Sequence, residues 1–113
     1  MRMPVLEIRT YRLREGTSAA FHRLLRTESV PLLQTSGIDV VRFGPSEQNE
    51  EGVEEYVLIR AFPSPADRDE QEDRFYGSDE WLAGPRERIL NLIESYHTIV
   101  LTTSEAAIDA LRG

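Results

Sequence analysis

Charged and aromatic side chains alternate with apolar ones along two segments that have the character of β-strands. Glu7, Arg9 and Tyr11 occupy every second position of the first segment, and Tyr56 and Arg60 share one parity in the second. Residues two apart in a strand project to the same face of a sheet. An arginine on such a face can hold a small anionic or phenolic ligand, because its guanidinium donates two parallel hydrogen bonds. We therefore take these residues as candidate ligand-binding residues.

Arg42 is a further candidate, but its place depends on the register of a shorter strand, 38–43. A shift of one residue would turn it to the opposite face. The whole set also has a simpler interpretation, in which Glu7 pairs with Arg9 or Arg60 to satisfy buried charge and no ligand is involved. Structural ion pairs are the more common case, so we keep both interpretations and favour the ion pair.

His22 and Trp81 are secondary candidates. His22 could transfer a proton near neutral pH, but it lies at the margin of an apolar helical stripe, where a histidine with a structural role is more common. Trp81 could close one end of a ligand cavity, although a single tryptophan in a short helical turn more often packs that turn onto the core. The chain has no cysteine and no His-x-x-x-His spacing, so we expect no metal site.

No familiar catalytic or cofactor motif is present. The chain lacks the Gly-x-Ser-x-Gly motif, a phosphate loop and a dinucleotide fingerprint, so we expect no cofactor. An enzyme of this kind would use a general acid or base such as Tyr11, Glu7 or His22. The acidic segment Asp67–Asp73 is interspersed with arginine, and we interpret it as the solvent-facing side of a helix. The sequence leaves open whether the protein is an enzyme.

The elements that position these residues form two strand-helix-strand units. Hydrophobic periodicity predicts strands over 5–13, 38–43, 55–62 and 96–103. One helix follows Gly16 and kinks or restarts at Pro31, and another begins after Ser64. Two such units in one domain, residues 1–113, predict an α+β, ferredoxin-like split βαβ fold: a four-stranded antiparallel sheet with helices on one face.

Strand parity predicts which side chains face those helices. In each strand one set of alternating side chains is aliphatic and the other is largely charged. We expect the aliphatic set to pack against the helices and the charged set to face the bare side of the sheet, where a second copy of the chain would bury it. The residues expected to face the helices are Leu6, Ile8, Val57, Ile59, Ala61, Ile99 and Leu101.

Composition argues against several classes of partner. Twenty acidic residues against thirteen basic ones give a net charge of −7. We therefore expect neither nucleic acid nor an anionic membrane surface as a partner, because both attract basic proteins. No apolar run approaches the length of a signal sequence or a membrane span, so we expect a soluble, cytoplasmic protein.

Several segments in order resemble the NIPSNAP family. They are Glu7-Ile8-Arg9-Thr10-Tyr11 before the turn at Gly16, Pro31-Leu32-Leu33 before Gly37-Ile38, and the run from Phe62 through Arg68 to Asp79-Glu80-Trp81. The resemblance spans Leu6 to about Thr102. It implies a dimeric α/β barrel, in which two ferredoxin-like protomers pack sheet against sheet with the helices outside. It implies no particular activity, because many members of the family have none assigned.

We therefore expect a homodimer that binds a small anionic or aromatic ligand in a cavity of the barrel and that could be a cofactor-free enzyme. The alternative is a non-catalytic homodimeric module with a structural or protein-interaction role. An exposed apolar patch outside the dimer interface would favour a protein-interaction module.

Overall fold

Four antiparallel strands form one sheet in the computed structural model, which describes residues 3–112. They are β1 (Val5–Leu13), β2 (Asp39–Pro45), β3 (Glu54–Phe62) and β4 (Ile93–Thr102), in the order β2-β3-β1-β4. The central strands β1 and β3 pair along their whole length, with Val5 opposite Phe62 and Leu13 opposite Glu54. This order is that of the split βαβ arrangement, so the predicted ferredoxin-like α+β fold is confirmed.

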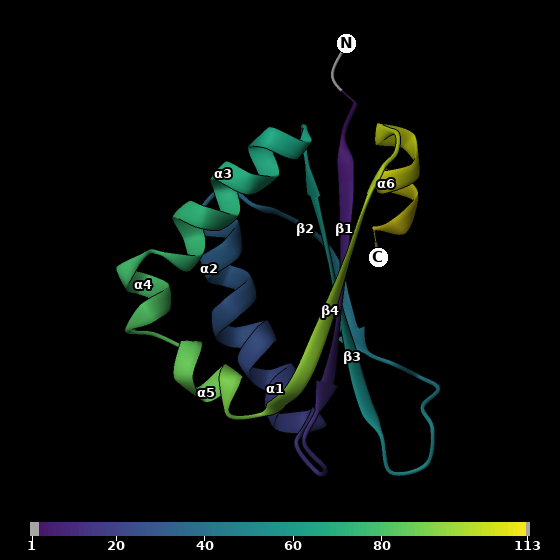
Figure 1. Ribbon diagram of the computed structural model, residues 1–113, viewed down its shortest axis with the longest axis vertical. Helices are drawn as coiled ribbons and strands as arrows, with labels where there is room; N and C mark the ends of the chain where they lie inside the picture. Colours follow the sequence, from purple (N-terminus) through teal and green to yellow (C-terminus); the bar gives the residue numbers. More distant parts are fainter. Residues whose placement is uncertain (1–2, 113) are drawn as a thin grey trace.

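The helices lie on both sides of the sheet, but unequally (Figure 1). One side carries α1 (Ser18–Leu24), η1 (Leu25–Ser29), α2 (Val30–Thr35), α3 (Pro65–Tyr76), α4 (Asp79–Leu82) and α5 (Arg86–Leu90). The other side carries α6 (Glu105–Leu111), which contacts β2. The expectation of helices on one face is therefore correct for all of them except α6. Within residues 3–112 no helix is long and apolar enough to cross a membrane.

The first helical arm runs from Ser18 to Thr35, and its middle is wound as a π-helix. Pro31 has no amide hydrogen, and in a regular α-helix its ring would clash with the carbonyl group four residues earlier. The π-helical segment Leu25–Ser29 ends two residues before this proline and widens the helix over the preceding turn. The irregularity predicted at Pro31 therefore takes the form of a local widening of the helix.

Ser64 begins α3, the helix that carries much of the candidate site. Its Oγ accepts a hydrogen bond from the Asp67 amide at 3.1 Å, and a proline occupies the first turn, where an amide hydrogen has no helical partner. The predicted helix start is therefore confirmed. Arg68, Glu72 and Tyr76 follow at intervals of four residues, so they project from one face of α3.

The predicted assignment of the strand faces is wrong, because the two faces are exchanged. The strand residues buried beneath α1–α5 include Val5, Tyr11, Leu13, Tyr56, Leu58 and Phe62. Leu6 and Ala61 instead pack with Ile108 of α6 on the opposite side. Large rings fill the space beneath the longer helices, and α3 supplies charged partners for the charged strand residues. The charged strand residues therefore find their ion-pair partners on the helical side of the sheet and do not lie on the bare face.

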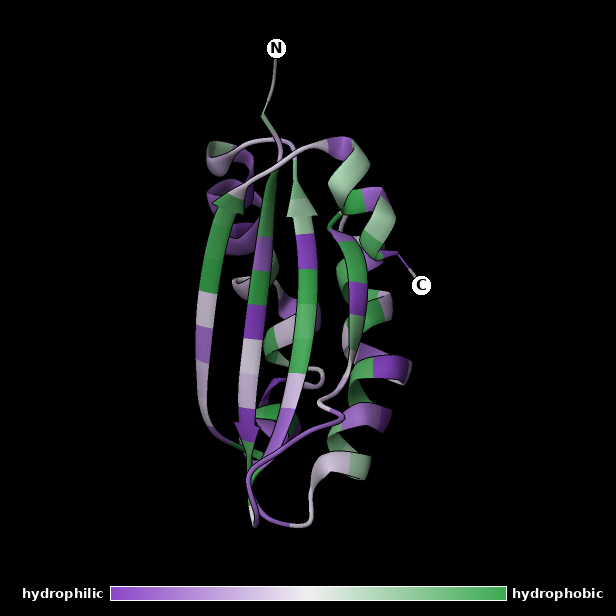
Figure 2. Ribbon diagram, turned by 90° about the vertical axis from the view of Figure 1, so that its right-hand side faces the viewer, coloured by the Kyte–Doolittle hydropathy of each residue, from purple (hydrophilic) through white to green (hydrophobic). Residues whose placement is uncertain are grey.

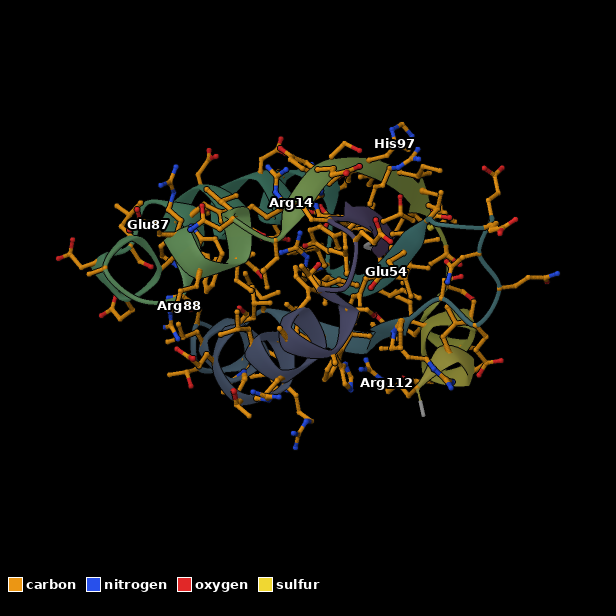
Figure 3. The ribbon with its side chains drawn as sticks, turned by 90° about the horizontal axis from the view of Figure 1, so that it is seen from below. Arg14, Glu54, Glu87, Arg88, His97 and Arg112 are labelled. Carbon is orange, nitrogen blue, oxygen red and sulfur yellow. The ribbon has the colours of Figure 1, made fainter. Side chains whose placement is uncertain are left out.

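The face that carries α6 is only partly covered (Figure 2). β1 and β4 lie open on this side, and Ile99 and Leu101 of β4 are 52% and 40% exposed. α6 is tied to β2 by Arg112, which donates to both carboxylate oxygens of Asp39 at 2.8 and 2.7 Å (Figure 3). An apolar strip along β4 is therefore left exposed to solvent.

Candidate functional site

Three guanidinium groups and two carboxyl groups meet between the sheet and α3. They belong to Glu7 and Arg9 of β1, Arg60 of β3, and Arg68 and Glu72 of α3, which we call the buried charge cluster. The Glu7 and Arg60 side chains have no exposure to solvent, and that of Arg9 is 13% exposed. Charges at this depth need close partners, because removing an ion from water costs several kcal/mol.

Glu7 is the well-satisfied carboxylate of the cluster. Arg60 Nε donates to its Oε2 at 2.7 Å, and Arg68 Nε donates to its Oε1 at 2.9 Å. Burial alone would raise the pKa of Glu7, but hydrogen bonding with Glu72 and the charge of Arg60 outweigh it and lower the pKa to about 2. Glu7 is therefore a fixed anion that neutralises Arg60.

Glu72 is less well satisfied. Its Oε1 accepts from the Arg9 NH2 group at 3.4 Å, which is a long hydrogen bond. Its Oε2 lies 3.0 Å from Arg68 Nε, but the single hydrogen of that nitrogen is donated to Glu7, so Oε2 accepts no hydrogen bond within residues 3–112. Burial and the hydrogen bond with Glu7 raise the pKa of Glu72 to about 7.

Tyr76 connects the two arginines of the sheet. Its hydroxyl oxygen accepts from the NH1 groups of Arg9 at 3.0 Å and of Arg60 at 2.7 Å. No group in the described part of the chain accepts the hydrogen of this hydroxyl. Arg9 also donates to Thr98 Oγ1 at 3.0 Å and to Glu72, so three of its five N–H groups are used. Tyr76 and Arg9 therefore retain unused donors.

A cavity of about 470 Å³ lies beside these unused donors, between the β1–β4 side of the sheet and α3, α4 and α5. Arg9, Glu72 and Tyr76 form its polar end, and Trp81, Ile89 and Ile93 are among its apolar lining residues. Asp73 and Arg86 add two further charged groups to the lining. Tyr96, which also lines it, is 61% exposed, and its ring lies 5.1 Å from the Arg9 guanidinium carbon. The cavity thus joins a polar end with hydrogen-bond donors to an aromatic and aliphatic interior.

The structure brings together part of the set of candidates predicted from the sequence. Glu7, Arg9 and Arg60 meet in the buried charge cluster, and the predicted pairing of Glu7 with Arg60 is present. Tyr11 lines the cavity, and its burial raises the pKa of its hydroxyl above the usual range. Trp81 also lines the cavity while packing against Tyr76, with 5.4 Å between ring centroids, so its core and cavity roles coexist.

Other candidates lie elsewhere. Tyr56 faces the helices but contacts His22, whose Nδ1 is 2.5 Å from its hydroxyl oxygen, and neither residue lines the cavity. Arg42 lies opposite Ile59 on the α6 side of the sheet, because a bulge in β2 shifts the register. The expectation that Arg42 shares a face with Glu7 and Arg60 is therefore wrong. His97 extends from the outer surface of the sheet (Figure 3).

Three residues of the site, Arg68, Glu72 and Tyr76, were missed by sequence reasoning. The acidic segment that contains Glu72 was interpreted as solvent-facing, but Glu72 is 9% exposed. A usable signal was present, because Arg68, Glu72 and Tyr76 recur at a spacing of four and Phe75 adds an apolar neighbour to that face. Within residues 3–112 no group of three or more His, Asp or Glu side chains is arranged to hold a metal ion.

Glu7→Gln should reduce the free energy of unfolding by about 3–5 kcal/mol, because it leaves Arg60 charged and without its buried counterion. The matched control is Glu94→Gln, which removes an exposed partner of Arg12 at 3.5 Å and should cost less than about 1 kcal/mol. Urea unfolding followed by circular dichroism measures both. Equal losses in the two variants would show that the cluster contributes no more than a surface pair.

Comparisons with known proteins agree with this fold. The NIPSNAP family model matches residues 6–106. A NIPSNAP family protein of unknown function from Agrobacterium tumefaciens is 28% identical over 91% of this chain and 90% of its own, with a TM-score of 0.80. Another from the same organism is 21% identical over 93% and 90%, with a TM-score of 0.79.

The fold also extends to more distant proteins. A proposed antibiotic biosynthesis monooxygenase from Caulobacter crescentus has a TM-score of 0.64 at 13% identity, covering 92% of each chain, which is a likeness of fold alone. No curated protein matches this sequence. Since the family model spans nearly all of the residues from the first strand to the last helix, the chain belongs to the NIPSNAP family.

Proposed function

We propose that this protein binds a small organic anion with an aromatic or otherwise apolar body in the cavity between β1, β4 and α3–α5. The observation that carries the proposal is the position of Arg9 at the polar end of that cavity. Two of its N–H groups are unused, and its side chain is 13% exposed. A carboxylate or phenolate oxygen would complete the hydrogen bonding of this guanidinium.

The charge balance of the buried charge cluster supports an anion. Three guanidinium groups face two carboxyl groups, and the exposed carboxylate of Asp69 also pairs with Arg68 at 3.3 Å, so the charges balance when all of these carboxyls are ionised. The raised pKa of Glu72 creates a surplus of positive charge near neutral pH, because part of the population then carries a proton on that carboxyl. A bound anion supplies the missing negative charge.

The remainder of the cavity favours an apolar body. Trp81 and Ile89 are 8% and 5% exposed, and both line the cavity together with Ile93. A volume of about 470 Å³ is within the range of small-molecule sites. The exposed ring of Tyr96 could cover an aromatic ligand at the entrance. An aromatic carboxylate has both of the features that this cavity accommodates.

Binding of 3-phenylpropanoate should change the fluorescence of Trp81, the only tryptophan in the chain. Arg9→Gln should weaken this binding at least tenfold, or about 1.4 kcal/mol, because it removes the charged donors at the polar end. The matched control is Arg12→Gln, which changes a half-exposed arginine of the same strand that faces the other side of the sheet. An equal loss in both variants, or no binding by the unaltered protein, would refute the proposed site.

We also propose that a second copy of the chain covers the open part of the α6 face. Ile99 and Leu101 are exposed there beside the partly buried Ile8 and Ile59. A sheet of this size gains stability when its uncovered face is buried. In a dimer with a two-fold axis, the apolar strip of one chain packs against the same strip of the second chain. The NIPSNAP resemblance implies the same sheet-to-sheet pairing. The non-catalytic homodimeric module would share this interface but would have no cavity ligand.

Light scattering after size exclusion should give the mass of two 12.9 kDa chains. Ile99→Asp should shift the protein to the mass of one chain, because it places a charge within the apolar interface while the side chain remains tolerable in a monomer at 52% exposure. Leu82→Asp, at a 50% exposed position on the helical side, should leave the dimer intact. A single-chain mass for the unaltered protein would contradict the proposal.

A further inference from the structure

We propose that Glu72 transfers a proton to and from a carbon atom of the bound ligand, next to a carbonyl group whose oxygen is held by Arg9 and Tyr76. The protein would then catalyse enolisation of small carbonyl compounds that carry an anionic group, such as aromatic 2-oxo acids. This inference rests on the proposed function, since it uses the same cavity. It goes further by assigning a reaction class and a role to each polar residue of the cavity.

The position and bonding of Glu72 suit a group that exchanges a proton with a ligand. It lines the cavity and is 9% exposed, so the Glu72 carboxyl group is largely shielded from water and would lie beside a bound ligand. Its Oε1 accepts a single, long hydrogen bond of 3.4 Å, from Arg9, which also lines the cavity. A carboxylate oxygen with a free lone pair beside a ligand cavity can accept a proton from that ligand.

The two carboxyl groups of the buried charge cluster differ in their surroundings. Glu7 is fully buried, accepts two short hydrogen bonds and does not line the cavity, so it serves as a fixed counterion. Glu72 lines the cavity, is weakly bonded and has its pKa raised to about 7. Surroundings that move the pKa values of two neighbouring carboxyl groups apart are typical of sites in which one carboxyl stays ionised and the other exchanges a proton.

Tyr76 and Arg9 can stabilise the negative charge that develops on the ligand. The Tyr76 oxygen accepts from two guanidiniums, at 3.0 and 2.7 Å, and these positive donors polarise its own O–H bond. That hydrogen has no acceptor in residues 3–112, and Arg9 retains two unused N–H groups. Together they can donate to an enolate oxygen in the way that an oxyanion hole does.

The proposed step is balanced without an oxidant or reductant. The ionised Glu72 carboxylate takes a proton from the carbon next to the carbonyl group. The electron pair of the broken C–H bond forms a C=C bond, while the π pair of the carbonyl moves onto its oxygen, where Arg9 and Tyr76 stabilise the charge. The protonated Glu72 carboxyl then returns a proton to carbon, and in deuterated water that proton has been replaced by deuterium.

Phenylpyruvate in deuterated water is the direct test, because it is the 2-oxo derivative of 3-phenylpropanoate. Proton NMR follows loss of the benzylic CH2 signal, and the spontaneous rate in buffer is subtracted. The unaltered protein should accelerate the exchange, and Glu72→Gln should reduce the enzymatic rate at least about 100-fold while 3-phenylpropanoate still binds. The matched control, Glu70→Gln, changes an exposed glutamate of the same helix and should leave the rate unchanged.

The pH profile and a second variant separate a catalytic role from a structural one. The rate should rise as pH increases through about 7, because the base must be ionised and Glu72 loses its proton there, facing Glu7, Arg9, Arg60 and Arg68. Tyr76→Phe should slow exchange at least about tenfold with Glu72 still in place, because it removes one donor to the enolate oxygen.

The outcomes distinguish this inference from the proposed function. Binding of both compounds without faster exchange would overturn proton transfer and leave the ligand site standing. Undiminished exchange in Glu72→Gln would overturn the assignment of Glu72. Failure of both compounds to bind would overturn the site and the reaction together.

Discussion

The fully buried ion pair between Arg60 and Glu7 is the interaction on which the rest of this structure depends. An arginine in the core does not lose its charge, so the fold must surround it with acceptors. β1 supplies Glu7, and α3 supplies Tyr76 and the second carboxyl group, which fixes the face that α3 presents to the sheet. With α3 held there, α4 and α5 follow at a distance that leaves a cavity beside Arg9. The satisfaction of one buried charge thus sets the position of the candidate site.

The same cluster contributes to both stability and the proposed site, because Glu7 is more strongly hydrogen-bonded than Glu72. Glu7 takes the short hydrogen bonds of Arg60 and Arg68, and Glu72 is left with a 3.4 Å bond from Arg9. A purely structural network would be expected to use all the donors of Arg9 and to bond Glu72 Oε1 closely, but beside the cavity two Arg9 donors are unused and the bond to Oε1 is long. The ion-pair interpretation and the ligand-site interpretation are therefore compatible: the Glu7 end of the cluster is structural, and the Glu72 end is available to a ligand.

The sequence predicted local features well and side-chain neighbourhoods poorly. The span of β1, the cap at Ser64 and the irregularity at Pro31 follow from nearest neighbours along the chain, and all are present. The two faces of the sheet were assigned the wrong way round, because alternation along a strand separates its residues into two faces without showing which face the helices cover. Arg42 was misplaced by a bulge, which no residue pattern marked. The role of Glu72 depends on contacts with Glu7 and Arg60 from distant strands, so its burial is a tertiary property.

The central claim is that two neighbouring carboxyl groups have widely separated pKa values, so that Glu72 titrates near neutral pH while Glu7 stays ionised. Carbon NMR of the protein labelled at glutamate carboxyl groups measures it directly, with Glu7→Gln and Glu72→Gln assigning the two signals. The account predicts that one glutamate titrates near pH 7 and another stays ionised down to about pH 2. Titration of every glutamate close to its ordinary pKa of about 4.3 would contradict it.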